Sequence, residues 1–295
     1  MLAIFSMIAS RLGFNILSVY WKIFRDRGVT TAAILAFSSV ATLPLILVIL
    51  AYNVYTGITL PSQIYLLVLA AWMVMIFATH FLAIFLYKYQ SLTASDSFRI
   101  VFGSLLALLI DTIIFKSALS PLILSGCGLM LIAALTLQRA RNPEKQHEKF
   151  QNIGQILLIN CVLGAVSVCE IALYKYGLNL LAGDIIQQIF WTNSLQVLVY
   201  LLWGGSELHR AVQKKTFKIK DMIVTTFIMC SALIAYTYAI GALPVLVIAL
   251  IRVAGSGIFA IFDVRLKEFT LNKKTIVALM AVLLGLGLIT LGNMD

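Results

Sequence analysis

Residues 242–268 read ALPVLVIALIRVAGSGIFAIFDVRLKE, and this stretch decides how the rest of the chain folds. About twenty apolar residues follow Pro244, which is enough to cross a bilayer as one α-helix. Arg252 lies within this run, and Asp263 follows it after eleven residues, about three helical turns, so both side chains point the same way. An arginine at membrane depth is costly unless it faces a partner or a water-filled cavity. The helix therefore has an inward face, and we expect that face to carry the function.

The same pattern occurs once before, in residues 91–116, which read SLTASDSFRIVFGSLLALLIDTIIFK. The small pair that begins at Gly103 and the acid Asp111 lie 152 residues before the matching features of the later stretch. Arg99 is one residue out of step with Arg252. A repeat at a fixed offset indicates that the chain consists of two related halves.

The composition excludes a soluble globular protein. Hydrophobic residues make up 61% of the 295 residues, charged residues 12%, and the mean hydropathy is +1.00. Long unbroken apolar runs are typical of membrane helices, whereas the strands of a barrel would alternate. We therefore predict an all-α integral membrane protein whose surroundings are the lipid bilayer. The net charge of +10 is explained by basic loops on one side of the membrane, so no nucleic-acid partner is expected.

The chain divides into five apolar spans, a polar linker and five further spans. The first half covers residues 1–138, the linker 139–152 and the second half 153–295. The expected spans lie at residues 2–21, 31–52, 63–87, 91–114, 121–137, 153–176, 184–203, 221–240, within 242–268, and 275–291. Because each half has an odd number of spans, two similar halves must insert in opposite orientations. This is the inverted-repeat design of many secondary transporters, in which the substrate lies between the halves near the midplane.

The distribution of basic residues predicts the orientation. Of the 22 lysines and arginines, three lie inside spans, 17 lie in the loops after the odd-numbered spans, and two lie in the other loops. The positive-inside rule places the basic loops in the cytoplasm and both termini outside. The compact loops suit a multi-pass protein of a bacterial inner membrane.

The layout resembles the drug/metabolite transporter superfamily, in its ten-helix EamA-like group. Besides the five-plus-five arrangement, the passage from Leu266 to Thr270 is similar to a shortened form of a Leu-Gly-Glu-Arg-Leu-Thr turn of that family. The glycine-rich last span, GLGLITLG at residues 285–292, is a further likeness. The chain departs from the family in having Lys267 where the turn has glycine, and in having termini predicted outside.

The resemblance implies a carrier. Its cavity would be lined chiefly by the third, fourth, eighth and ninth helices, with contributions from the first and sixth. The superfamily transports amino acids, nucleotide sugars, vitamins, phosphorylated metabolites and lipophilic cations, so the resemblance does not name the substrate.

Three arginines are the candidate anion ligands. Arg252 and Arg99 lie in helices that the resemblance places at the cavity, and a guanidinium grips a carboxylate or phosphate with two hydrogen bonds. Arg99 has the alternative of pairing with Asp96, three residues earlier on the same face. Arg11, in the first span, is either a third anion ligand or the partner of Glu170 in an ion pair that joins two helices.

The other candidate side chains are titratable or aromatic. Glu170, Asp111 and Asp263 are candidates for coupling transport to protons, because a buried carboxylate can titrate near neutral pH. Asp111 and Asp263 lie near the ends of their spans and have the alternative of an interfacial position. His80 is either an anion-binding group that titrates in the useful range or a hydrogen-bonded structural residue. Tyr238, together with Trp72 and Tyr236, could stack on a ring or a cation.

These residues favour a secondary active transporter of a small anionic or zwitterionic metabolite, which works by alternating access. The alternative is a proton-coupled exporter of amines or lipophilic cations that uses Glu170, although the arginines would repel such a substrate. A membrane-embedded enzyme is disfavoured because the chain contains no zinc-binding, nucleophile-elbow or diphosphate motif. The four cysteines show no metal spacing. We therefore expect no catalytic residue, metal or cofactor, and leave the coupling ion and the oligomeric state open.

Overall fold

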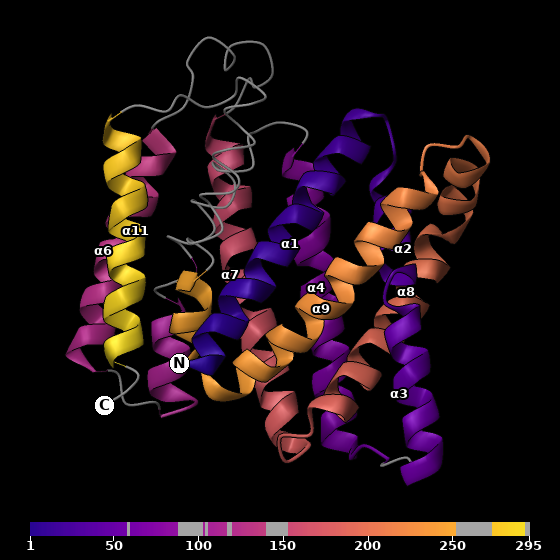
Figure 1. Cartoon of the computed structure of the whole chain (residues 1–295), viewed down its shortest axis with the longest axis horizontal. Coiled ribbons are helices and arrows are strands. Elements are labelled where there is room, and N and C mark those ends of the chain that lie inside the picture. Colours follow the sequence, from indigo (N-terminus) through magenta and orange to yellow (C-terminus); the bar gives the residue numbers. More distant parts are fainter. Residues whose placement is uncertain are drawn as a thin grey trace.

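The computed structural model describes residues 1–57, 60–87, 103, 106–116, 120–139, 153–251 and 273–292, and these residues form helices and turns without strands. The all-α prediction is confirmed for this part of the chain (Figure 1). The helices are α1 (Leu2–Asp26), α2 (Thr31–Val40), α3 (Leu43–Thr56), α4 (Gln63–Tyr87), α6 (Pro121–Arg139), α7 (Ile153–Leu180), α8 (Ile185–Gln213), α9 (Ile219–Ala242) and α11 (Lys273–Gly292). Helical turns also occur at residues 106–113 and 245–251.

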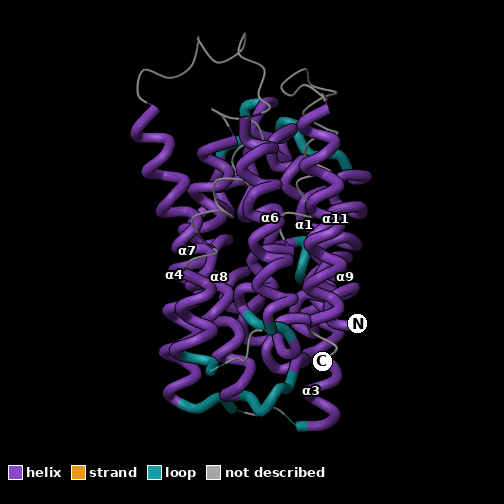
Figure 2. The backbone as a smooth tube through the Cα atoms, turned by 90° about the vertical axis from the view of Figure 1, so that its left-hand side faces the viewer, coloured by secondary structure: helices purple, strands orange, loops and turns teal. Residues whose placement is uncertain are grey.

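Six segments of the described chain are long and apolar enough to cross a membrane: α1, α2 with α3, α4, most of α7, α8 and α9. Shorter apolar helices occur in α6 and α11. Figure 2 shows the helices running side by side along one direction, with most turns at the two ends. The architecture is compatible with a multi-pass membrane protein.

Two helices extend well beyond their predicted spans. The first span was expected to end near residue 21, but α1 continues to Asp26, so most of the expected basic loop is helical. The seventh was expected to end near residue 203, but α8 continues to Gln213. Hydrophobicity marks where a helix leaves the apolar region, and hydrogen bonding can continue it into water. Lys175 is one of the two basic residues assigned above to the loops on the less basic side. It lies inside α7 and is buried.

The second predicted span is interrupted. The structure divides it into α2 and α3 at the turn of Ala41 and Thr42. Pro44 occupies the first turn of α3 and has no N–H to continue the hydrogen bonds of α2. The Cys230 thiol of α9 lies 3.7 Å from the Ala41 carbonyl oxygen, and the Thr42 hydroxyl donates to the Ser39 carbonyl at 2.8 Å. Side chains therefore satisfy carbonyl groups that the break releases.

The helices pack mainly in pairs that are distant in the sequence: α1 with α9, α2 with α8, α4 with α7, and α6 with α11. Close approach of α6 and α11 depends on glycine. A Cβ at Gly126 would lie 2.6 Å from the Gly285 carbonyl oxygen, and a Cβ at Gly285 would lie 2.9 Å from that of Gly126. A Cβ added at Gly128 or Gly287 would have no atom within 4 Å. Gly126 and Gly285 therefore allow the two helix backbones to approach closely.

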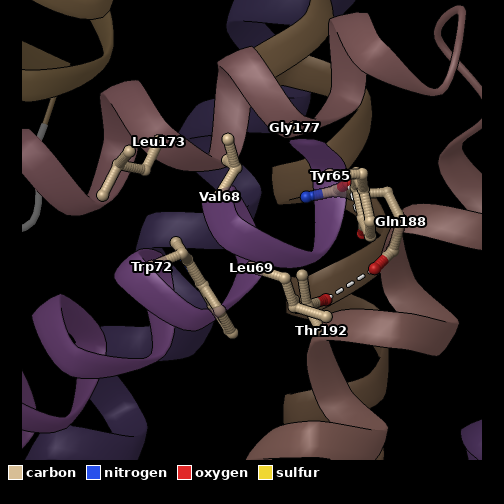
Figure 3. Close-up of a pocket in the computed structure, with 8 residues that line it drawn as sticks. All are labelled: Tyr65, Val68, Leu69, Trp72, Leu173, Gly177, Gln188 and Thr192. Atoms are coloured by element: carbon tan, nitrogen blue, oxygen red, sulfur yellow. Dashed lines mark hydrogen bonds between the residues drawn. The ribbon is translucent and has the colours of Figure 1, made fainter. Parts of the chain in front are cut away.

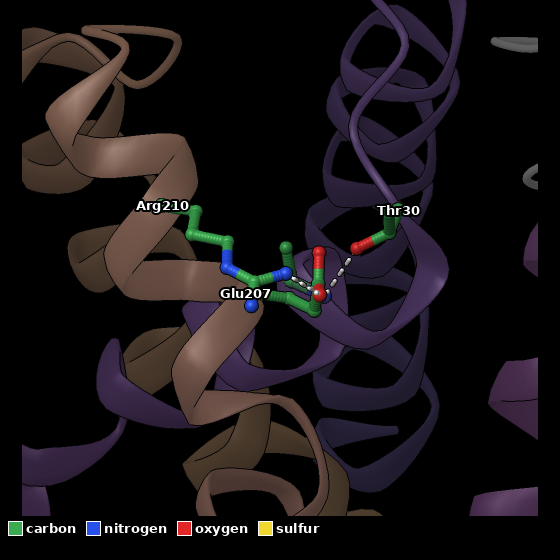
Figure 4. A network of polar contacts seen from close by, with 4 residues as sticks. Thr30, Glu207 and Arg210 are labelled. Atoms are coloured by element: carbon green, nitrogen blue, oxygen red, sulfur yellow. Dashed lines mark hydrogen bonds and ion pairs between the residues drawn. The ribbon is translucent and has the colours of Figure 1, made fainter.

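The contact between α2 and α8 is closer still. A Cβ at Gly204 of α8 would lie 2.2 Å from the carbonyl oxygen of Ala32 in α2, whereas the adjacent Gly205 has nothing within 4 Å. Near this contact, the Thr30 side chain accepts a hydrogen bond from the Ala33 N–H at 3.2 Å and so caps α2. Figure 4 shows Thr30 beside the α8 ion pair of Glu207 and Arg210, whose charged atoms are 2.9 Å apart.

Opposite charges hold the turn between α9 and the helix at residues 245–251. The Lys175 ammonium of α7 donates to the Leu243 carbonyl oxygen at 2.5 Å. The Asp111 carboxylate accepts from the Val245 and Leu246 N–H groups at 2.8 and 2.5 Å, and its residue is fully buried. A cation thus meets the negative end of one helix and an anion the positive end of the next, as the helix dipoles favour.

Basic residues gather at one end of the molecule. Figure 1 places the turn after α1, the end of α8 and the start of α11 together at the top. The turn between α7 and α8 lies at the opposite end. The end that carries the α1, α8 and α11 termini includes Arg25, Arg27, Arg210, Lys214, Lys215, Lys218, Lys273 and Lys274. The described part of the chain therefore keeps most of its loop charge at one end.

Candidate functional site

A cavity lies among α1, α4, α7, α8 and α9. The centre of a water molecule can occupy about 100 Å³ of it, which is room for several waters, since about 10–15 Å³ suffices for one. Its described lining is rich in polar and aromatic side chains. The lining residues are Arg11, Phe14, Asn15, Leu17, Ser18, Trp21, Trp72, Ile76, Thr79, His80, Ala83, Glu170, Tyr174, Thr192, Asn193, Gln196, Met229, Leu233 and Tyr236.

Arg11 enters the cavity from α1. Its residue is 8% exposed, and the central guanidinium carbon lies 5.1 Å from the centre of the Tyr236 ring on α9. Phe14, one turn along α1, meets the same ring edge-on at 5.7 Å between ring centres. A guanidinium against an aromatic face is attracted by the ring and held in place by it. The α1–α9 contact therefore orients a permanent positive charge in the cavity wall.

Glu170 supplies negative charge from α7. Its residue is 7% exposed and lines the same cavity as Arg11. One turn along α7, the hydroxyl of Tyr174 shares a hydrogen bond of 2.7 Å with that of Thr237 on α9. This bond ties α7 to α9 beside the carboxylate. Sequence reasoning left open whether Arg11 and Glu170 serve a substrate or each other, and the structure brings both to one cavity.

His80 lies half-buried on α4, in an arrangement of aromatic rings. Its Nδ1 is 2.9 Å from the hydroxyl oxygen of Tyr200, a fully buried residue of α8. The Trp21 ring of α1 meets the imidazole edge-on at 5.2 Å between ring centres. The Trp21 Nε1–H donates to the Ser38 hydroxyl of α2 at 2.7 Å, so the indole is fixed. Three helices besides α4 thus position the imidazole at the cavity.

Three further lining residues have polar atoms without a hydrogen-bond partner among the described residues. They are the Asn15 amide nitrogen, the Trp72 Nε1–H and the Thr79 hydroxyl. Each residue is more than nine-tenths buried. A buried polar group that lacks a partner costs about 1–3 kcal/mol. These atoms indicate that the cavity is built to surround a polar molecule or ordered water.

Next to this cavity, side chains of α4, α7 and α8 line a second, smaller pocket that has no room for a water molecule. Figure 3 shows Tyr65 and Trp72 of α4 facing Gln188 and Thr192 of α8. The Tyr65 hydroxyl donates to the Gln188 Oε1 at 3.0 Å, and the Thr192 hydroxyl donates to the Gln188 carbonyl oxygen at 2.6 Å. Trp72 and Thr192 also line the cavity, so this packed contact forms part of its wall.

Sequence reasoning missed the contribution of α8. Thr192, Asn193 and Gln196 line the cavity, yet the seventh helix was not among those expected there. A signal was present, because Gln188, Thr192 and Gln196 recur every four residues within an apolar stretch and so share one helix face. Uncharged amides also need hydrogen-bond partners in an apolar setting, so their positions indicate an inward helix face as charged residues do.

The remaining predicted site residues divide into two groups. Tyr238 is 39% exposed and is not among the lining residues, whereas Tyr236 on the same helix is. Arg252, Arg99, Asp96 and Asp263 lie outside the described residues. Within the residues that the structure does describe, no three His, Cys, Asp or Glu side chains are grouped as metal ligands would be.

Comparisons with known proteins address the fold. No family model and no curated protein matches the chain. Among the solved structures that match is one described only as "Crystal structure of protein", with a TM-score of 0.58 and 16% sequence identity. The likeness covers 96% of this chain and 96% of that chain. At this identity it concerns the fold alone, and it extends over nearly the whole length.

Proposed function

We propose that this protein is a secondary carrier that moves a small anionic or zwitterionic metabolite across a cell membrane by alternating access. The observation that carries the proposal is the cavity in which Arg11, His80 and Glu170 meet, enclosed by five helices. Ionisable groups at the centre of a hydrophobic helical bundle are costly and mark substrate or ion pathways. A guanidinium suits a carboxylate or phosphate, and a carboxylate opposite it suits an ammonium group.

The arrangement of helix pairs supports a carrier made of two inverted five-helix repeats, in the drug/metabolite transporter superfamily. In the predicted numbering of spans, α1, α4, α7 and α9 are the first, third, sixth and eighth. Exchanging the two halves turns the α1–α9 pair into the α4–α7 pair, and both pairs are present. The same exchange leaves the α2–α8 and α6–α11 pairs unchanged, because each pair joins corresponding spans of the two halves, and both pairs are present. A pattern that survives exchange of the halves is expected of a duplicated fold.

The gathering of basic residues at one end of the bundle supports placing the basic loops in the cytoplasm and both termini outside, following the positive-inside rule.

The second candidate function is a proton-coupled exporter of amines or lipophilic cations. The observation in its favour is the ring-lined wall around Glu170, because aromatic faces attract organic cations. The aromatic lining residues are Phe14, Trp21, Trp72, Tyr174 and Tyr236.

A thermal-shift screen of the detergent-purified protein distinguishes the two candidates. The panel contains amino acids, organic acids, sugar phosphates, nucleotides, nucleotide sugars and quaternary amines. A ligand that binds the folded state raises the melting temperature. We expect an anionic or zwitterionic group to do so, and Arg11→Gln to abolish the effect, while Tyr238→Phe, outside the cavity, retains it. Stabilisation by amines alone, lost in Glu170→Gln, would establish the cation exporter instead.

A further inference from the structure

His80 lies in the wall of the cavity, where a tyrosine hydroxyl and an indole ring contact its imidazole. His80 contacts the Tyr200 hydroxyl through Nδ1 at 2.9 Å, and its ring faces the indole of Trp21. Histidine is the side chain that ordinarily changes charge between pH 5 and 8. The hydroxyl of tyrosine can donate to a neutral imidazole nitrogen and accept from a protonated one. Tyr200 is therefore a partner for both charge states of His80.

The charge of the cavity lining depends on the protonation state of the imidazole. Among the described residues that line the cavity, Arg11 supplies a guanidinium group and Glu170 a carboxyl group. A proton on His80 adds one positive charge to this lining. Other charged or titratable groups face the same region from neighbouring helices, and the described α2 has none. They are Tyr174 of α7, Tyr200 of α8 and Tyr236 of α9, and Lys22, which follows Trp21 in α1, is also buried.

We propose that His80, held by Tyr200, binds a proton together with an anionic substrate in the cavity, so that the carrier moves the two in the same direction. The inference rests on the proposed carrier function and adds the co-transported ion. Protonation adds one positive charge to the cavity wall, and this charge favours an anion over a neutral molecule. At a separation of about 10 Å and an effective dielectric constant near 20, one added unit charge strengthens anion binding by roughly tenfold.

Thermodynamic linkage between proton binding at His80 and anion binding predicts a measurable shift in the His80 titration. If protonation of His80 tightens anion binding about tenfold, anion binding must favour the protonated imidazole by the same factor. A tenfold change moves the midpoint of the His80 titration upward by about one pH unit. The shift does not depend on reconstituted transport, so it tests the proton site separately from the carrier function.

The first experiment uses Trp21 as a built-in reporter, because a protonated imidazole quenches a neighbouring indole more strongly than a neutral one. Trp72, Trp191 and Trp203 are replaced by phenylalanine, and emission is followed from pH 8 to pH 5 in detergent. We expect quenching with a single midpoint, and its loss in His80→Gln, which keeps a polar group beside Tyr200. Emission that does not respond to pH, or a response that persists in His80→Gln, would overturn the proton site.

A second measurement keeps the test decisive should the reduced-tryptophan variant fail to fold. The chain has three histidines, His80, His147 and His209, so ¹⁵N-histidine labelling of the otherwise unmodified protein gives few signals. The His80 signal is assigned as the one missing from His80→Gln. Titration of that signal between pH 5 and 8 supports the proposal, and a signal that keeps one charge state over this range refutes it.

The coupling is tested by repeating the titration with acetate, lactate, benzoate, succinate and inorganic phosphate, each at several concentrations. We expect at least one of these anions to raise the His80 midpoint by about one unit, and Arg11→Gln to remove the shift. A midpoint unmoved by all five would overturn proton–anion coupling. Stabilisation by anions in the thermal screen could still stand in that case, whereas a titrating His80 without any stabilising ligand would count against the carrier function.

Discussion

At the residue scale, charged side chains identified part of the cavity lining from the sequence. The rotation of each helix about its axis decides which of the other candidate residues face the cavity. Arg11, His80 and Glu170 stand out in the sequence because ionisable groups are rare in apolar helices. Tyr236 and Tyr238 were not separable in this way. Two residues that are two positions apart on a helix point about 200° apart, so only one of them could face the cavity. The sequence does not reveal the rotation of α9, which is set by its packing on α1.

The buried turn held by Asp111 makes a residue-scale prediction. Asp111→Asn removes the charge that meets two N–H groups and that lies within electrostatic range of Lys175. Charged hydrogen bonds contribute about 1.5–3 kcal/mol each, and the amide oxygen retains part of this. We expect a loss of about 1–3 kcal/mol in the free energy of unfolding, measured by denaturant titration in mixed micelles.

The matched control is Thr112→Ala, on the same helix but exposed, where the hydroxyl donates to the Leu108 carbonyl oxygen within the same helix. Its change in stability should stay within about 0.5 kcal/mol. The double variant of Asp111→Asn with Lys175→Gln should be less destabilised than the sum of the single changes, because each leaves the other charge buried. Equal effects of Asp111→Asn and Thr112→Ala would show that the turn does not depend on this carboxylate.

At the element scale, hydrophobic runs predicted which segments are helical, while other interactions set where helices end and bend. The third span and α4 share the same bounds, residues 63–87, because a polar turn precedes the apolar run. The α2–α3 break was missed although Pro44 was visible, since proline is accepted in the first turn of a helix and disrupts an interior. Whether a proline begins a helix or interrupts one depends on side chains such as Cys230, which lie far away in the sequence.

Two adjacent glycines of α8 predict opposite effects of one substitution. In Gly204→Ala the new methyl group would overlap the Ala32 carbonyl of α2, so the helices must separate. We expect a loss of about 1–3 kcal/mol. In Gly205→Ala the methyl group enters open space, and alanine is the better helix former by up to about 1 kcal/mol. Melting temperatures of the two variants should therefore lie below and above that of the unmodified protein.

A variant pair on the other helix contact serves as a check. Gly126→Ala should destabilise the α6–α11 pair, and Gly128→Ala should not, because only the first faces a backbone carbonyl. If all four alanine variants behaved alike, helix propensity alone would account for the stability changes, and the close contacts would have no energetic weight.

At the scale of the whole molecule, the segregation of charge predicts which end faces the cytoplasm. Leu60, between α3 and α4, and Lys214, directly after α8, are both exposed. Figure 1 shows the end of α3 and the end of α8 at opposite ends of the bundle. In a background without the four native cysteines, we expect Leu60→Cys to react with a membrane-impermeant maleimide on intact cells. Lys214→Cys should react only after the membrane is opened, because the basic end faces inward. The measurement is the mass shift of the labelled protein.

Other labelling patterns would correct the whole-molecule proposal in definite ways. Reaction of Lys214→Cys alone on intact cells would reverse the orientation. Reaction of both sites from outside would mean that the two ends do not lie on opposite sides of a membrane. The two-sided pattern could be predicted from sequence because it depends on a sum over many loop residues, which an error in one helix boundary hardly changes.

The contacts that Lys175 and Asp111 make with the turn after α9 also have an evolutionary consequence. Lys175 and Asp111 come from different helices, yet they hold adjacent carbonyl and N–H groups of one short turn. A lineage that lost either side chain would retain the other as an uncompensated buried charge, a change that selection removes unless the second follows quickly. Among relatives of this protein, the lysine and the aspartate should be inherited or replaced together, although 64 positions separate them in the chain.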